Sequence, residues 1–151
     1  MPHVDPKKKV ELLTRFWNEG YILLDNVLTD ELINDVLKEV KKLDFVEIFV
    51  TLYPEVMDQF REQAKIDLDT SNVMQDVNDI VVEIISDLHT KWSVATKTWH
   101  CLKSLPNGQT QQLHRDFPVF ETTEAVTKHD WVQASVSIAL EDDTRILADP
   151  R

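Results

Sequence analysis

Apolar side chains in the first half of the chain recur at the three- and four-residue spacing of helices with one buried face. The pattern predicts four helices, over residues 6–19, 30–43, 54–65 and 73–89. Asp5 and Pro6 are typical of a helix start, Gly20 is typical of a helix end, and Thr29 can cap the second helix. A short apolar run over residues 21–24 favours a strand, and residues 45–53 fit either a strand or a buried helix.

The pattern changes at Trp92, where residues rich in Thr, Val and Trp begin to alternate in the way that strands do. We expect one long strand or two over residues 92–102, followed by strands over residues 111–116, 131–140 and 146–148. Residues 106–108 indicate a turn, and residues 117–130 indicate a loop. Helices followed by strands favour an α+β fold, with N-terminal helices packed on an antiparallel sheet. We expect one domain over residues 1–151, helical to about residue 89 and strand-rich from about residue 90.

Composition and charge narrow the classes of function. The net charge of −11 disfavours nucleic acid as the main partner, because phosphate binding relies on clustered Lys and Arg. Only two glycines occur, which excludes glycine-rich phosphate loops. Cys101 is the single cysteine, so a reducing compartment is expected. With no secretory signal and no apolar run long enough for a membrane span, we expect an intracellular, cytoplasmic protein without a membrane partner.

The candidate chemistry lies in His114-Arg115-Asp116. Alternate residues of a strand share one face, so the imidazole of His114 and the carboxylate of Asp116 are expected to project together, with Arg115 turned away. Two such ligands and a distant second histidine make the facial triad that holds Fe(II) in non-haem oxygenases. The tripeptide alone is common, and its spacing by itself favours a surface ion pair.

Three stretches of the sequence give this tripeptide a context. They are Phe16–Asp25 with Leu28–Ile33, Gln112-Leu113-His114-Arg115-Asp116-Phe117-Pro118, and Val132–Thr144. With these stretches in this order, the chain resembles the phytanoyl-CoA dioxygenase-like branch of the Fe(II)- and 2-oxoglutarate-dependent oxygenases. The resemblance implies a double-stranded β-helix of the jelly-roll or cupin kind, with His114 and Asp116 as metal ligands. It also implies Fe(II) and 2-oxoglutarate as cofactors and hydroxylation of an unidentified small molecule or protein.

The chain departs from the family pattern after Asp116. The family has a second histidine several strands later and then an arginine for the co-substrate. Here, seven residues follow Thr144 and none is a histidine, so the resemblance implies a chain shortened at its C-terminus. His129 is a less favoured substitute ligand because a loop histidine is usually solvated, and Arg145 and Arg151 are candidate carboxylate binders only by default.

The incomplete metal site leaves two other hypotheses open. The chain can be a non-catalytic binding protein of the oxygenase fold, with a homo-oligomer covering an open sheet edge. It can also be an unrelated α+β domain in which the His-x-Asp spacing is accidental. Two weaker features are more simply explained by structural roles. Glu141-Asp142-Asp143 is expected to form an acidic turn, and the core is the expected place of Trp92, Trp99 and Trp131. His100 and Cys101 are adjacent and so face opposite sides of a strand, which disfavours a thiol and base pair.

Overall fold

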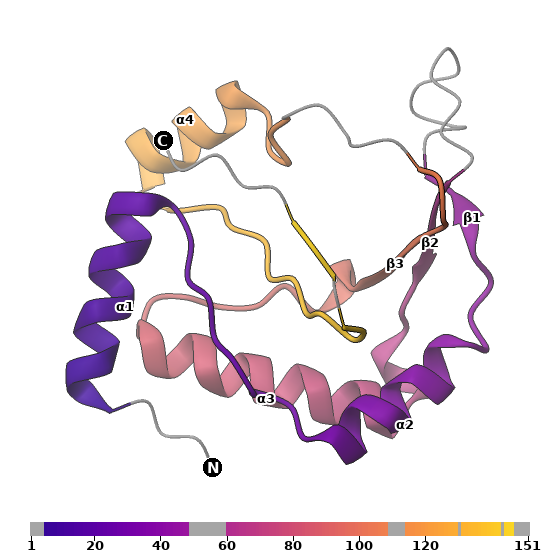
Figure 1. Ribbon diagram of the computed structural model, residues 1–151. Coiled ribbons are helices and arrows are strands. Elements are labelled where there is room, and N and C mark those ends of the chain that lie inside the picture. The colour runs from indigo at the N-terminus through magenta and orange to yellow at the C-terminus, as the bar shows by residue number, and fades with distance from the viewer. Residues whose placement is uncertain (1–4, 49–59, 109–113, 130, 143, 147–151) are drawn as a thin grey trace. The chain divides into compact units, whose positions relative to one another are not determined.

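A computed structural model describes residues 5–48, 60–108, 114–129, 131–142 and 144–146 (Figure 1). The chain divides into two compact units, Met1–Gln109 with Pro150–Arg151 and Thr110–Asp149, which we describe separately. Within the described residues, the architecture consists of four α-helices and an open three-stranded antiparallel sheet. The α+β prediction is therefore confirmed, whereas the jelly roll and the single domain over residues 1–151 stay predictions.

The first helix, α1, spans Pro6–Glu19 as the sequence predicts. The Asp5 side chain accepts a hydrogen bond from the Lys7 backbone amide at 3.0 Å, which satisfies one of the free amides of the first turn. At the other end, Gly20 adopts a left-handed conformation with φ of 84°. Its amide donates to the Phe16 carbonyl at 2.8 Å and closes the helix.

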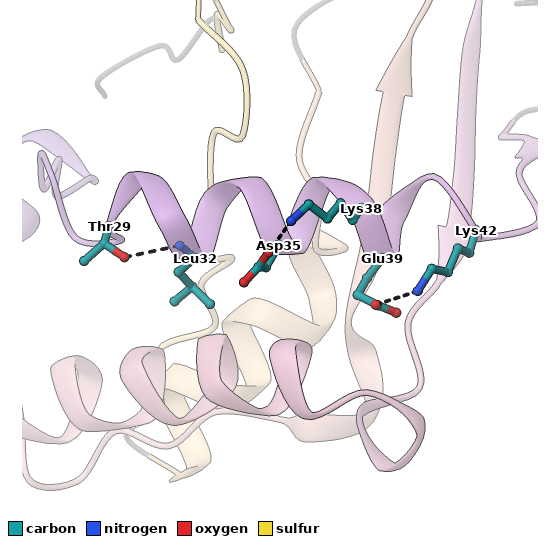
Figure 2. A network of polar contacts seen from close by, with 6 residues as sticks. All are labelled: Thr29, Leu32, Asp35, Lys38, Glu39 and Lys42. Carbon is teal, nitrogen blue, oxygen red and sulfur yellow. Dashed lines mark hydrogen bonds and ion pairs between the residues drawn. The ribbon is translucent and has the colours of Figure 1, made fainter.

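The second helix, α2, spans Asp30–Val40. Thr29 caps it by accepting a hydrogen bond from the Leu32 amide at 3.2 Å, and the ion pairs Lys38–Asp35 and Lys42–Glu39, each at 2.7 Å, follow along the same helix (Figure 2). The helix ends three residues before the predicted Leu43. There the Leu43 amide bonds to the Val40 carbonyl at 3.1 Å, which is the tighter three-residue turn typical of a helix end.

The third helix, α3, spans Asn72–Leu88 and provides the main apolar face of the first unit. Its buried apolar residues are Met74, Val77, Val81, Ile84 and Leu88. Ile84 and Leu88 pack with Leu12 of α1, and around this cluster lie Ile22, Leu24, Val27, Ile80 and Trp92. Full burial of an aliphatic side chain contributes about 1.5–3 kcal/mol, so this cluster anchors α1 to α3. Trp92 is partly buried and packs against the core, as expected. Ile22 and Leu24 also supply core contacts, although residues 21–24 do not form the predicted strand.

The sheet of the first unit has the order β1–β2–β3, with every pair antiparallel. Its strands are β1 (Val46–Glu47), β2 (Arg61–Lys65) and β3 (His100–Ser104). The predicted helix over residues 54–65 is wrong over residues 61–65, and residues 54–59 lie outside the described residues. β2 pairs on both sides, and Lys103 of β3 forms a 2.8 Å ion pair with Glu62 directly opposite. These cross-strand contacts override the helix propensity of Arg61–Lys65.

The strand predicted over residues 92–102 is shorter than expected. A 3-10 helix, η2, spans Thr96–Thr98, and the Thr98 hydroxyl donates to the Ala95 carbonyl at 2.8 Å. β3 begins only at His100. The predicted turn after it is present, with Asn107 in a left-handed conformation and the Gly108 amide 3.4 Å from the Leu105 carbonyl.

The second unit contains α4, which spans Val119–His129 and replaces the predicted loop over residues 117–130. The helix was missed because three threonines give it low helix propensity. In the structure, Thr123 and Thr127 donate their hydroxyl hydrogens to carbonyls one turn earlier, and Lys128 pairs with Glu124 at 2.6 Å. The Glu124–Lys128 pair, four residues apart, stabilises the helix from its own surface.

The predicted strand over residues 131–140 is not formed, because no described residue pairs with it in a ladder. The described parts of the strands predicted over residues 111–116 and 146–148 are also not strands, and residues 111–113, 147 and 148 lie outside the description. Among the helices that the structure describes, none combines the length and the apolar character that a membrane crossing needs.

Candidate metal site

His114 and Asp116 lie close together at the start of the described part of the second unit. The His114 Nε2 atom is 3.7 Å from Asp116 Oδ1, and the two side chains are 58% and 61% exposed. The sequence therefore predicted their juxtaposition, although residues 114–116 do not form a strand. The pair presents one nitrogen and one carboxylate oxygen toward solvent, where an ion can reach both.

Ser135 fixes the other oxygen of the carboxylate. Its hydroxyl donates to Asp116 Oδ2 at 3.0 Å, across 19 residues of sequence. This bond leaves Oδ1 on the side of His114 and limits rotation of the carboxylate, as an outer-shell hydrogen bond does in a metal site. Sequence reasoning missed Ser135, and the only signal for it was its place among the polar positions that alternate with Val132, Ala134, Val136 and Ile138.

The spacing of the two atoms fits two neighbouring positions around one ion. Ligands about 2.1 Å from a shared ion and at right angles to each other are roughly 3.0 Å apart. The observed 3.7 Å closes to that value with a small side-chain rotation, which exposed side chains make readily. The residues therefore fit an iron-type site as a pair of ligands.

A third protein ligand is not described. Within the described ranges, no group of three His, Cys, Asp or Glu side chains is placed to hold a metal ion. His129 ends α4 and its ring stacks on Trp131, with centroids 4.8 Å apart and planes at 30°. Trp131 itself is 65% exposed, so the expectation of a core position is wrong for this residue. Arg145 is exposed, and Arg151 lies outside the described residues.

A hollow of about 270 Å³ opens beside α4. It is lined by Arg115, Val119, Thr122, Thr123, Val126 and Thr127. Arg115 is thus directed to the helix, whereas its two neighbours in sequence form the His–Asp pair. The residues that line the hollow carry apolar, hydroxyl and guanidinium groups.

The weaker candidates have local structural roles. The His100 ring nitrogen Nδ1 lies 2.9 Å from the Thr98 carbonyl oxygen. Burial raises the pKa of the Cys101 thiol, which lowers the fraction of reactive thiolate at neutral pH. The acidic stretch begins with a turn, in which the Thr144 hydroxyl donates to the Glu141 carbonyl at 2.8 Å. These contacts give no support to a thiol and base pair.

Comparison of the chain with protein-family models, with curated proteins and with solved structures finds no match.

Proposed function

We propose that the chain is an Fe(II)- and 2-oxoglutarate-dependent oxygenase-like protein that hydroxylates an unidentified substrate. The observation that supports this proposal is the His114–Asp116 pair at 3.7 Å, with the carboxylate held by Ser135. Two ligand types that non-haem iron uses are thus brought together at the position where the sequence resembles the metal strand of the family. The proposal includes the jelly-roll fold of that family.

Each residue of the pair has a defined role in this proposal. His114 binds through its neutral Nε2, and Asp116 binds through Oδ1 and neutralises part of the charge of the ion. Ser135 keeps Asp116 in the orientation that binding requires. Fe(II) with 2-oxoglutarate would supply the oxidising chemistry, and the described residues of this chain hold two of the three positions that proteins of this kind fill.

The alternative is a non-catalytic protein of the same fold that works by binding a partner. Two observations favour it. The described residues provide no third ligand, and large apolar side chains of the second unit are exposed, with Phe120 77% and Trp131 65% accessible. Exposed aromatic side chains of this size are available for contact with a partner.

Metal binding tests the site directly. We expect anaerobic titration with Mn(II), followed by the electron paramagnetic resonance signal of the free ion, to reveal one site in the intact chain. His114→Ala and Asp116→Asn each remove one of two ligands, so each should weaken binding by at least about 10-fold. His100→Ala is the matched control, because His100 is also an exposed histidine but lies on β3 in the other unit. The proposal is wrong if the intact chain fails to bind Mn(II) at millimolar concentration.

Turnover separates the two candidate functions. An active oxygenase should convert 2-oxoglutarate to succinate under air with Fe(II) and ascorbate, and His114→Ala should abolish the conversion. Proton NMR of the reaction mixture measures both compounds. Mn(II) binding that depends on His114 without any succinate would instead favour the non-catalytic alternative.

A further inference from the structure

Residues 131–135 run back along α4, in the direction opposite to the helix. The Trp131 amide donates a hydrogen bond to the Ala125 carbonyl at 3.0 Å, in the C-terminal half of the helix. Two residues later, Gln133 accepts a hydrogen bond from the hydroxyl of Thr122, three residues earlier on α4, at 3.2 Å. Because the later residue of the segment meets the earlier residue of the helix, these two contacts fix the direction and the register of the segment.

The same order of contacts continues to Ser135. Its hydroxyl donates to Asp116 Oδ2 at 3.0 Å, and Asp116 precedes Val119, the first residue of α4. Trp131, Gln133 and Ser135 are alternate residues, and each makes one contact with a progressively earlier part of the chain. All of these groups belong to the second unit and to its described residues. The hold of Ser135 on Asp116 is therefore the last of three linked contacts.

Thr122 has a contact that the other threonines of α4 do not make. The hydroxyls of Thr123 and Thr127 donate to carbonyl oxygens of the helix itself, at 2.8 and 2.7 Å. The hydroxyl of Thr122 instead donates to a side chain outside the helix, that of Gln133. Thr122 thus joins α4 to the segment that carries Ser135.

The length of chain between the contacts shows why this link matters for Ser135. Two residues span at most about 7 Å, and four residues span at most about 14 Å. Gln133 is two residues from Ser135, whereas Trp131 is four residues away. The Thr122 contact therefore confines Ser135 close to Asp116. With the Trp131 contact alone, the hydroxyl of Ser135 could move about twice as far from its anchor and lose its hold on the carboxylate.

We propose that Thr122 is a positioning residue of the metal site, which keeps Asp116 in place through Gln133 and Ser135. The inference rests on the proposed function, because it concerns the site that His114 and Asp116 form. A carboxylate that is already held in one orientation loses less freedom when it binds an ion, so it binds more tightly. α4 thereby sets the affinity of the site, although neither proposed ligand lies on that helix.

Mn(II) binding tests this role of Thr122. Thr122→Val keeps the shape of the side chain and removes the hydroxyl, so the Kd for Mn(II) should rise at least about 3-fold. Thr122→Ser keeps the hydroxyl and should bind like the intact chain. Thr123→Val is the matched control, because it makes the same substitution at a hydroxyl that bonds within the helix. Equal weakening by Thr122→Val and Thr123→Val, or unchanged binding by Thr122→Val, would overturn the proposal.

A double-mutant cycle tests the route through Ser135. Ser135→Ala removes the hydrogen bond to Asp116 and should raise the Kd for Mn(II) at least about 10-fold. In this background Thr122→Val should have no further effect, because the contact through which it acts is already lost. An effect of Thr122→Val that is equal in the two backgrounds would show a different route and would contradict the proposal.

The contact between Ser135 and Asp116 can also be measured without a metal ion. The nuclear Overhauser effect between the side-chain protons of these residues reports their proximity. Its intensity should be the same in the intact chain and in Thr123→Val, and it should be lower in Thr122→Val. Such a loss supports the role of Thr122 even if the intact chain does not bind Mn(II), an outcome that would count against the proposed function alone. Equal intensity in Thr122→Val and Thr123→Val would overturn the proposed role.

Discussion

Asn78 is a polar side chain buried in the apolar face of α3, with 4% of its surface accessible. Its amide group donates to Asp79 at 3.2 Å, whereas its Oδ1 atom has no hydrogen-bond partner among the described residues. A buried oxygen without a partner loses its hydration without compensation. Asn78 is therefore a position where the sequence departs from the helical pattern of α3 at a cost in stability.

Replacing Asn78 with leucine should stabilise the fold. Asn78→Leu keeps the branched shape and the number of side-chain heavy atoms of asparagine, removes the unsatisfied oxygen and continues the apolar face that Val77 and Val81 form. We expect a gain of about 1 kcal/mol in the free energy of unfolding, measured by urea denaturation. Asp76→Leu, at an exposed position of the same helix, should give no comparable gain. A loss of stability in Asn78→Leu would show that the buried amide makes a necessary contact.

The Arg15–Glu19 pair gives a prediction for pH. Arg15 Nε donates to the Glu19 carboxylate at 2.7 Å, and this hydrogen bond holds the pKa of Glu19 below its usual range. A lowered folded-state pKa stabilises the fold above the unfolded pKa, and the contribution is lost as the pH falls through the folded pKa. Glu19→Gln should thus lower the melting temperature at pH 7 and have a smaller effect at pH 3. Glu11→Gln, at an exposed position of α1, is the control, and an effect of Glu19→Gln that does not change with pH would contradict this linkage.

At the scale of single residues, the pairing of His114 with Asp116 was predicted from the sequence, whereas the contact of Ser135 with this pair was not. His114 and Asp116 were predicted from a spacing of two, and they are adjacent even though the backbone there is not a strand. Ser135 could not be identified, because a contact across 19 residues depends on how the chain folds back. Local spacing encodes this pair of neighbouring side chains, whereas the residue that supports them is encoded only by tertiary structure.

At the scale of elements, the residues that cap helices were the best predicted features. Asp5, Gly20 and Thr29 act as caps in the structure as their residue types predict, because a cap depends on atoms within four residues. Strands depend on a partner that is distant in sequence. Arg61–Lys65 became a strand despite its helix formers, and residues 131–140 did not become a strand despite their alternation.

Gly20 offers a test of the α1 helix end. A Cβ at Gly20 would have no atom within 4 Å, so the cost of Gly20→Ala comes from the left-handed backbone alone. We expect a loss of about 1–2 kcal/mol in the free energy of unfolding. Gly20→Asn should cost less, since asparagine tolerates this conformation. Chemical denaturation of the three proteins measures the order, and a loss in Gly20→Asn that equals the loss in Gly20→Ala would contradict the argument.

At the scale of the whole molecule, the sequence predicted the fold class and not the arrangement of its strands. The α+β prediction rests on helical spacing of apolar residues in the first half of the sequence and on strand-like alternation in the second half. The buried face of α3 confirms the helical spacing. The second unit was predicted less well, because α4 is rich in threonine and the segment after it pairs with no strand in the described part of the chain. Both failures lie in Thr110–Asp149, where local propensity and tertiary contacts disagree.

The uncharged Trp131–Leu140 segment also bears on the colloidal behaviour of the protein. At neutral pH, the net charge of −11 keeps molecules apart. In mild acid, protonation of the carboxylates removes this repulsion while the segment itself is unchanged. Strand pairing between molecules is then less strongly opposed, and pairing of this kind is the route to fibrils. The acidic surface thus serves as a solubility safeguard for one exposed strand-forming sequence.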